Sequence, residues 1–132
     1  MQRTSCFVVL LLVALVPAGC GEDKDAPYLA FEGGGFIFNY RHATVRYGFN
    51  VRPLRRLERG MAIEARMENP AGGTPFLLRQ TVLGDVLRYS FHSPELTGVV
   101  KGKDYKVEVT MLDKDLKTVL GRYEHSYRSE ID

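Results

Sequence analysis

The chain has 132 residues, of which 45% are hydrophobic and 26% are charged, and its formal net charge at pH 7 is +2. This length accommodates one domain with a hydrophobic core of its own. The near balance of 18 basic and 16 acidic residues lacks the basic excess of a nucleic-acid-binding protein, so the composition argues against that class.

Residues 1–19 are predicted to be a signal peptide that is removed from the mature protein. Arg3 supplies the positive charge, residues 7–16 form an apolar run, and small residues follow. A segment that crosses a bilayer needs about 20 apolar residues, and this run is shorter. We therefore expect a cleaved leader and an exported protein that faces the periplasm or the cell surface.

Cys20 is the next informative residue. Because Cys6 lies within the leader, Cys20 would be the only cysteine of the mature protein and would have no disulfide partner. The sequence Ala18-Gly19-Cys20 resembles the end of a bacterial lipobox, which implies lipidation of Cys20 and a membrane anchor. Gly21, by the same resemblance, favours the outer membrane. Cleavage after Ala18, which would release a soluble protein, is the alternative.

The polar and charged residues 20–27 are predicted to be a lipidated tether, and residues 28–132 the domain that it carries. In this domain apolar and polar residues alternate with the period of two that is typical of half-buried strands. Strands are expected at residues 28–31, 36–40, 45–51, 61–67, 76–82, 87–91, 105–111 and 119–127. Seven or eight short antiparallel strands separated by turns predict an all-β sandwich.

Local signals refine this outline at three places. Three consecutive glycines, residues 33–35, favour a break or a bulge after the first strand. Pro53 and Gly60 bracket a segment with Leu54 and Leu57 three residues apart, which predicts one helical turn between two strands. In residues 87–91 the odd-numbered positions are apolar, so Leu87 is expected to face inward together with Tyr89 and Phe91.

Tyr105 carries a resemblance at the level of the fold. The step from Gly102 to Tyr105 opens a long alternating strand and resembles the tyrosine corner of immunoglobulin-like and fibronectin type III sandwiches. The resemblance implies an immunoglobulin-like β-sandwich in which the Tyr105 hydroxyl bonds to backbone upstream. The chain contains no tryptophan, so the cysteine and tryptophan set of antibody domains is missing.

The residues predict no catalytic site, no metal site and no cofactor. No nucleophile elbow occurs, and the histidines are too far apart in sequence to form a local ligand pair. Methionines at inward-facing positions are expected to fill the core. The histidines are His42, His92 and His125, and these methionines are Met61, Met67 and Met111. We therefore expect a non-enzymatic protein.

Arginine is the one unevenly distributed residue type. Seven arginines lie between residues 41 and 66, and four of them surround the predicted helical turn. Because guanidinium groups bind phosphates and carboxylates in a bidentate way, the anionic ligand could be a lipid head group, a lipopolysaccharide phosphate or an acidic protein surface. The candidate partner-binding residues are Arg52, Arg55, Arg56 and Arg59.

The leading hypothesis is therefore an envelope lipoprotein that presents a binding or accessory module to an envelope protein. Two alternatives remain open. In the first, Tyr40, Tyr47 and Tyr123 hold a glycan, a lipid or a metal, which would require an apolar cavity or an exposed aromatic strip. In the second, the protein is a purely structural envelope lipoprotein without a specific ligand.

Overall fold

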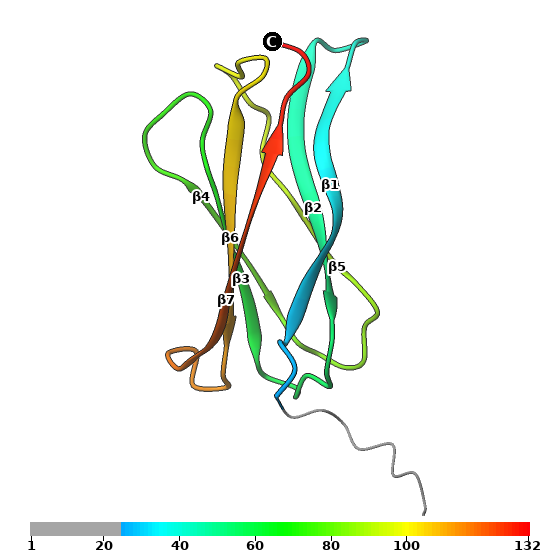
Figure 1. Ribbon diagram of the computed structural model, residues 1–132, viewed down its shortest axis with the longest axis vertical. Coiled ribbons are helices and arrows are strands. Elements are labelled where there is room, and N and C mark those ends of the chain that lie inside the picture. The colour runs from blue at the N-terminus through cyan, green and yellow to red at the C-terminus, as the bar shows by residue number, and fades with distance from the viewer. Residues whose placement is uncertain (1–24) are drawn as a thin grey trace, which may run out of the picture.

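The computed structural model describes residues 25–132, so the predicted leader, Cys20 and most of the predicted tether lie outside the described residues. The described part consists of seven antiparallel strands in two packed sheets (Figure 1). The prediction of an all-β sandwich of seven to eight strands is confirmed. Its strands are β1 (Leu29–Asn39), β2 (Thr44–Pro53), β3 (Ala62–Met67), β4 (Phe76–Thr81), β5 (Tyr89–His92), β6 (Asp104–Leu112) and β7 (Val119–Arg128).

The two sheets contain three and four strands. One has the order β1-β2-β5 and the other β4-β3-β6-β7. Figure 1 shows that the described chain begins at the lower end of the sandwich, where the connections β2–β3, β4–β5 and β6–β7 also lie. The connections β1–β2, β3–β4 and β5–β6 lie at the upper end, as does the C-terminus. The two ends of the sandwich therefore carry different sets of loops. Among residues 25–132, no helix is long and apolar enough to span a membrane.

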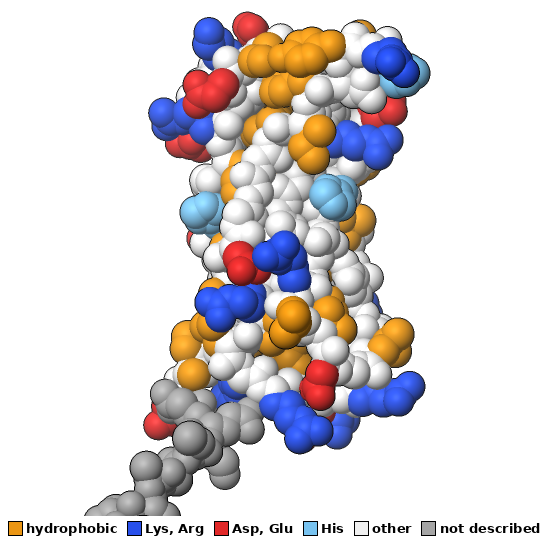
Figure 2. Space-filling view, turned by 90° about the vertical axis from the view of Figure 1, so that its right-hand side faces the viewer, with side chains coloured by type: hydrophobic (Ala, Val, Ile, Leu, Met, Phe, Trp, Pro, Cys, Tyr) orange, Lys and Arg blue, Asp and Glu red, His pale blue; other side chains and the backbone are white. Residues whose placement is uncertain are grey.

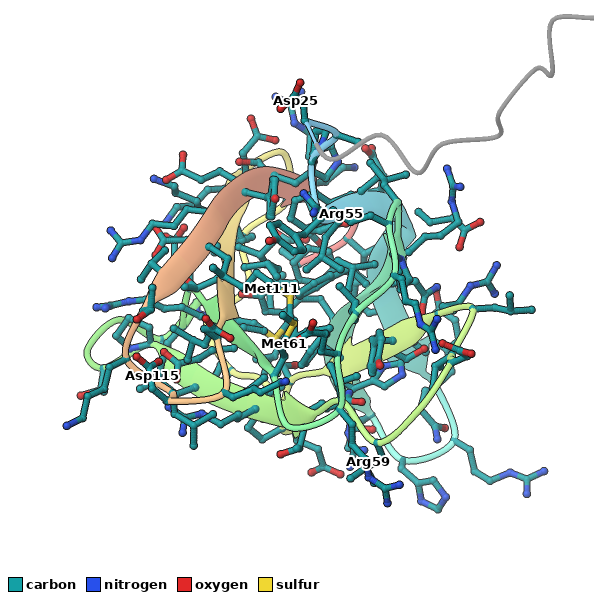
Figure 3. The ribbon with its side chains drawn as sticks, turned by 90° about the horizontal axis from the view of Figure 1, so that it is seen from below. Asp25, Arg55, Arg59, Met61, Met111 and Asp115 are labelled. Carbon is teal, nitrogen blue, oxygen red and sulfur yellow. The ribbon has the colours of Figure 1, made fainter. Side chains whose placement is uncertain are left out.

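The core fills the space between the sheets, because each strand turns alternate side chains inward. Residues 61–67 follow the predicted alternation at their odd-numbered side chains, which are all buried, whereas Ala62 is buried as well. Met61, Met67 and Met111 are also buried, in agreement with their expected role as core residues, and Figure 3 shows Met61 and Met111 in the middle of the molecule. The largest fully buried side chains are those of Tyr47, Tyr105, Phe49, Phe91, Ile63, Met67 and Met111.

The first two expected strands are one continuous strand, β1, with a bulge. The register against β2 shifts between Phe31 and Gly34, so the glycine run produces the predicted bulge without ending the strand. An added Cβ atom on Gly34 would lie 2.7 Å from the carbonyl oxygen of Gly48 and from a ring carbon of Tyr127. Glycine is therefore required at residue 34 for close packing of β1 against β2 and β7.

The predicted helical turn at residues 53–60 is wrong. After Pro53 the segment is irregular, because backbone groups of distant segments pair with it: the Leu54 N–H donates to the Tyr28 carbonyl at 2.8 Å, and the Gly60 N–H donates to the Val82 carbonyl at 2.9 Å. Only a tight turn remains at its end, where the Met61 N–H donates to the Glu58 carbonyl at 3.1 Å. Hydrogen bonds to distant residues here outweigh the local signals for a helix.

The inward orientation predicted for Leu87 is also wrong, because Leu87 is 90% exposed. Strand β5 begins only at Tyr89, where pairing with Val51 of β2 begins. From there Tyr89 and Phe91 are buried, as predicted. The alternation of apolar residues therefore holds only where the segment pairs with the sheet, and Leu87 lies in the loop before it.

Three buried tyrosines differ in what their hydroxyl groups contact. The Tyr105 hydroxyl accepts a hydrogen bond from the Val100 N–H at 2.8 Å. The Tyr47 hydroxyl donates to the Glu68 carbonyl at 2.5 Å. The Tyr127 hydroxyl is buried and has no hydrogen-bond partner among the described residues. A buried hydroxyl without a partner costs free energy, so these residues should respond differently to loss of the oxygen.

Tyr105→Phe is expected to lower the free energy of unfolding by about 1–2 kcal/mol, because it leaves a backbone N–H without its acceptor. Tyr127→Phe, the matched control, should leave the stability unchanged or raise it slightly, because it removes an unpaired polar atom. Urea unfolding of both variants at pH 7, followed by circular dichroism, measures the difference. Equal losses in the two variants would contradict the assignment of these hydroxyl contacts.

The free energy of unfolding should also depend on pH through Tyr127. Burial raises the pKa of Tyr127 to about 12, whereas an unfolded tyrosine ionises near pH 10. Between these values the unfolded chain releases a proton that the folded chain retains, so the stability falls as the pH rises above about 10. Tyr127→Phe should make this alkaline loss shallower. Part of it should remain, because burial also raises the pKa of Tyr47.

Candidate functional site: the arginine end

Figure 3, which views the sandwich from its lower end, shows Arg55 and Arg59 together with Asp25 at this end. Arg52 and Arg56 belong to the same short segment, residues 52–59. Arg52 is exposed near the end of β2, where the buried Val51 precedes it. In the following loop the side chain of Leu57 is buried and anchors the segment, while Arg56 and Arg59 are exposed. Residues 52–59 and the facing loop, residues 83–88, are called the arginine end below.

Arg55 ties the arginine end to the incoming chain. Its guanidinium lies 4.2 Å from the centroid of the Tyr28 ring, and Nη1 lies 3.5 Å from the Ala26 carbonyl oxygen. The Tyr28 N–H in turn donates to the Tyr123 hydroxyl at 2.9 Å. The chain therefore enters beside residues 52–59, called the arginine loop below, and Tyr28 ties it to the edge strand β7.

Glu32 on β1 holds two arginines at once. Its carboxylate accepts a hydrogen bond from Arg88 Nε at 2.9 Å and lies 3.9 Å from Arg52 Nε. The hydrogen bond from Arg88 is the main cause that keeps the pKa of Glu32 below its usual value, and the charge of Arg52 adds to it. One carboxylate therefore interacts with two guanidinium groups, and the three side chains together keep a net positive charge.

Arg88 was not among the residues that the sequence singled out. It stands between Leu87 and Tyr89 in a segment that predicts only a half-buried strand. Its position beside Arg52 depends on the pairing of β5 with β2, which places Tyr89 opposite Val51. No local signal in the sequence indicates that pairing.

Glu58 links the arginine loop to the β6–β7 loop. The Lys114 ammonium lies 2.8 Å from a Glu58 carboxylate oxygen, and the hydrogen bond between them lowers the pKa of Glu58 and raises that of Lys114. Both side chains are exposed, so this ion pair adds little stability. It nevertheless neutralises Glu58, which is the carboxylate closest in sequence to Arg56 and Arg59.

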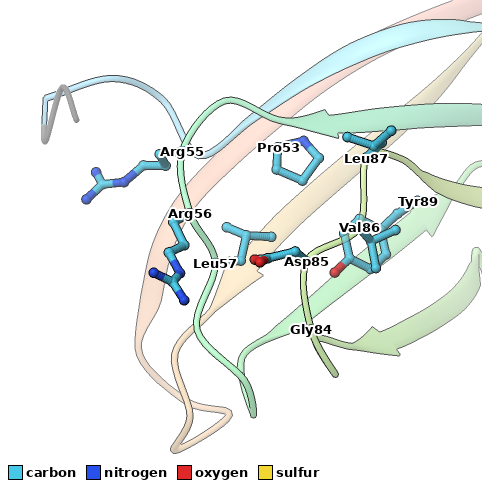
Figure 4. A pocket seen from close by; sticks show the side chains of 9 residues that line it. All are labelled: Pro53, Arg55, Arg56, Leu57, Gly84, Asp85, Val86, Leu87 and Tyr89. Atoms are coloured by element: carbon cyan, nitrogen blue, oxygen red, sulfur yellow. The ribbon is translucent and has the colours of Figure 1, made fainter. Parts of the chain in front are cut away.

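An open pocket of about 200 Å³ separates the two loops of the arginine end. Figure 4 shows Leu57 and Asp85 pointing toward one another across it, whereas Arg55 and Arg56 extend away from it. Burial and, to a lesser degree, the charge of Asp85 raise the pKa of Tyr89, so this phenol stays neutral. Neither guanidinium group enters the pocket, an arrangement that suits an extended anionic surface better than a small anion in a cavity.

Apolar side chains stand exposed among these charges. Leu83 is 68% exposed and Val86 is 44% exposed, and both lie in the same loop as Leu87. Figure 2 shows hydrophobic side chains and basic side chains side by side at this end of the molecule. These exposed apolar side chains were not expected from the sequence, because the alternation in residues 87–91 predicts that Leu87 lies in the core.

The other candidates from the sequence lie apart from one another. Tyr47 is fully buried and Tyr123 is half-buried beside Tyr28, whereas Tyr40 is 79% exposed at the upper end. The Tyr40 ring stacks on Phe38 at a centroid distance of 6.4 Å, beside a second open pocket of about 340 Å³. The three tyrosines therefore do not form a common aromatic surface.

Metal-binding groups are likewise dispersed in the described part of the chain. His42, His92 and His125 are all exposed and lie on different elements, and the His125 ring stacks on Phe31 at 5.3 Å. Within residues 25–132, no group of three or more histidine, cysteine, aspartate or glutamate side chains is arranged to hold a metal ion.

Comparison with known proteins does not assign the chain to a family. No family model matches it, and neither the search of curated proteins nor the search of solved structures returned a match.

Proposed function

We propose that this chain is an exported, lipid-anchored and non-catalytic binding module of the bacterial envelope. In this proposal residues 1–19 are the signal peptide, Cys20 carries the lipid, residues 20–27 are the tether, and the β-sandwich of residues 28–132 is the accessory domain. The observation that carries the proposal is the placement of the arginine loop and the entry of the chain at one end of the sandwich, joined by Arg55 and Tyr28.

We further propose that the sandwich is immunoglobulin-like, close to the fibronectin type III arrangement. Two features support this assignment. Sheets of three and four antiparallel strands pack face to face, and Tyr105 near the start of the sixth strand accepts a hydrogen bond from backbone five residues upstream. A tyrosine near the start of the sixth strand with this bond is characteristic of the tyrosine corner.

The arginine end is the proposed site for anionic groups. Residues 52–59 and 83–88 contain five arginines and two carboxylates, and the two partners that contact them, Glu32 and Lys114, carry opposite charges. An envelope protein partner would then contact the opposite end, where Tyr40 and Phe38 border an open pocket. The purely structural role remains the competing proposal, and it predicts no effect of these residues on binding.

The anchor is tested by metabolic labelling with an alkyne fatty acid in a bacterial host. The wild-type chain and Cys6→Ala, whose change lies within the leader, should both incorporate the label, whereas Cys20→Ala should lose it. Cys6→Ala is the matched control because it removes the only other cysteine of the chain. Equal labelling of Cys6→Ala and Cys20→Ala, or no labelling of the wild-type chain, would overturn the proposed anchor.

A further inference from the structure

We infer that the arginine end is a membrane-docking surface: its arginines contact the phosphates of anionic lipids, and Leu83, Val86 and Leu87 enter the interface between head groups and acyl chains. This inference rests on the proposed lipid anchor at Cys20 and names the anionic ligand of the same site. It is argued from the reach of the tether, the charge of the surface and its exposed apolar side chains.

The first argument is the reach of the chain. Asp25 lies five positions after Cys20, and a fully extended chain spans at most about 18 Å over five residue steps. An acyl chain on Cys20 would therefore hold Asp25, and with it the lower end of the sandwich, close to the membrane surface. Arg55 lies against Tyr28 and Ala26 and so belongs to the part of the domain nearest the anchor.

The second argument is charge complementarity. The arginine end has three more basic than acidic groups, and each basic residue near an anionic membrane surface contributes about 1 kcal/mol of attraction. The acidic Asp115 belongs to the β6–β7 loop, and Figure 3 shows it on the other side of this end, away from Arg55 and Arg59. The arginine end is thus the basic part of the surface that the tether would bring to the lipid.

Exposed apolar side chains lie beside the arginines. Leu87 is 90% exposed and is followed directly by Arg88, whose guanidinium is held by Glu32. Hydration of an exposed leucine is unfavourable, and its transfer into the interfacial region of a bilayer lowers the free energy. Leu83 and Val86 of the same loop are exposed as well, so the arginine end presents several apolar side chains to the interfacial region rather than a single one.

The test uses the absence of tryptophan from the native chain. Leu87→Trp places a single fluorophore at the arginine end, and Val100→Trp places one at the upper end, where Val100 is also exposed. Each protein is purified from membranes with its anchor and reconstituted into vesicles of phosphatidylcholine, with or without phosphatidylglycerol, that contain brominated lipid as a quencher. Mass spectrometry of the same preparations records whether Cys20 is acylated.

The inference predicts that Leu87→Trp is quenched and shifted to the blue in the vesicles that contain phosphatidylglycerol, and that Val100→Trp is not. Adding Arg56→Gln and Arg59→Gln to Leu87→Trp should lower the docking equilibrium constant roughly 30-fold, at about fivefold for each arginine. Arg41 and Arg46 lie at or near the upper end. Changing both to glutamine in Leu87→Trp, as the matched control, should have little effect on the docking equilibrium constant. High salt should weaken the quenching.

Several outcomes would overturn the inference. Acylated Leu87→Trp that is quenched no more than Val100→Trp would do so while leaving the anchor intact, and the arginine end would then be assigned to an acidic protein surface. A preparation without an acyl group would overturn the anchor itself. In that case the same fluorophores are measured with vesicles added to the purified protein: selective quenching of Leu87→Trp still supports the docking surface, and its absence overturns it.

Discussion

Phe49→Ala is expected to lower the free energy of unfolding by about 3–5 kcal/mol, the cost that is typical of removing a buried aromatic ring. Phe49 is 1% exposed, and its ring lies 5.5 Å from that of Phe31, 5.4 Å from that of Phe91 and 6.0 Å from that of Tyr127. These rings belong to strands of both sheets. Their packing therefore joins the two layers, and the alanine variant would leave a cavity between them.

Urea unfolding followed by circular dichroism gives the free energy and also the dependence on denaturant, which reports whether the variant still unfolds in one step. Tyr40→Ala is the matched control, because it also removes an aromatic ring but at a position that is 79% exposed. Its effect should stay within about 0.5 kcal/mol. A loss below about 1 kcal/mol for Phe49→Ala would show that this ring does not hold the sheets together.

Gly34→Ala should be the second most damaging change, with an expected loss of roughly 2–3 kcal/mol. The added methyl group would lie 2.7 Å from the Gly48 carbonyl oxygen, from the Phe49 Cβ and from a ring carbon of Tyr127. Two of these atoms belong to β2, which cannot move aside without breaking its pairing with β1. The strain would thus have to be relieved by opening the bulge.

Gly84→Ala provides the control for this substitution. No described atom lies within 4 Å of a Cβ added to Gly84, and its φ angle is not among the positive ones. Alanine restricts the unfolded chain more than glycine does, so Gly84→Ala should be neutral or stabilising by about 0.4–1 kcal/mol. Thermal unfolding of both variants decides the point: a destabilisation of Gly34→Ala no greater than that of Gly84→Ala would contradict the packing described at the bulge.

The strands were largely predictable because side-chain alternation is a local property. Residues 63–67 show this most clearly, since the alternation of apolar and polar residues there matches the burial seen in β3. The bulge was also predictable, since three glycines in a row allow backbone conformations that other residues avoid. In each case the signal and the structure lie within the same few residues.

The errors concern segments whose conformation depends on distant residues. Residues 53–60 combine signals for a helical turn, yet hydrogen bonds to Tyr28 and Val82 hold the segment in an irregular, non-helical conformation. Leu87 continues the apolar alternation of β5 but lies before the point at which β5 joins β2. The composition of the candidate site was accordingly predictable only in part. Four of its arginines lie close together in sequence, whereas the fold brings Arg88 and the exposed leucines to them.

Together these features give the two ends of the sandwich separate roles in the proposed function. The lower end combines the entry of the chain with basic and exposed apolar side chains, and the proposal directs it to the membrane. The upper end, with Tyr40 stacked on Phe38, would then point away from the lipid. Both assignments depend on one covalent feature, the acylation of Cys20.

Mass spectrometry of the mature N-terminus tests that feature most directly. The protein is purified from the membrane fraction with detergent, digested, and its first peptide is sequenced. We expect the mature chain to begin at Cys20 and this residue to carry covalently attached acyl chains. A mature chain that begins at Gly19 with a free amine, and with an unmodified Cys20 beside it, would rule out the lipid anchor.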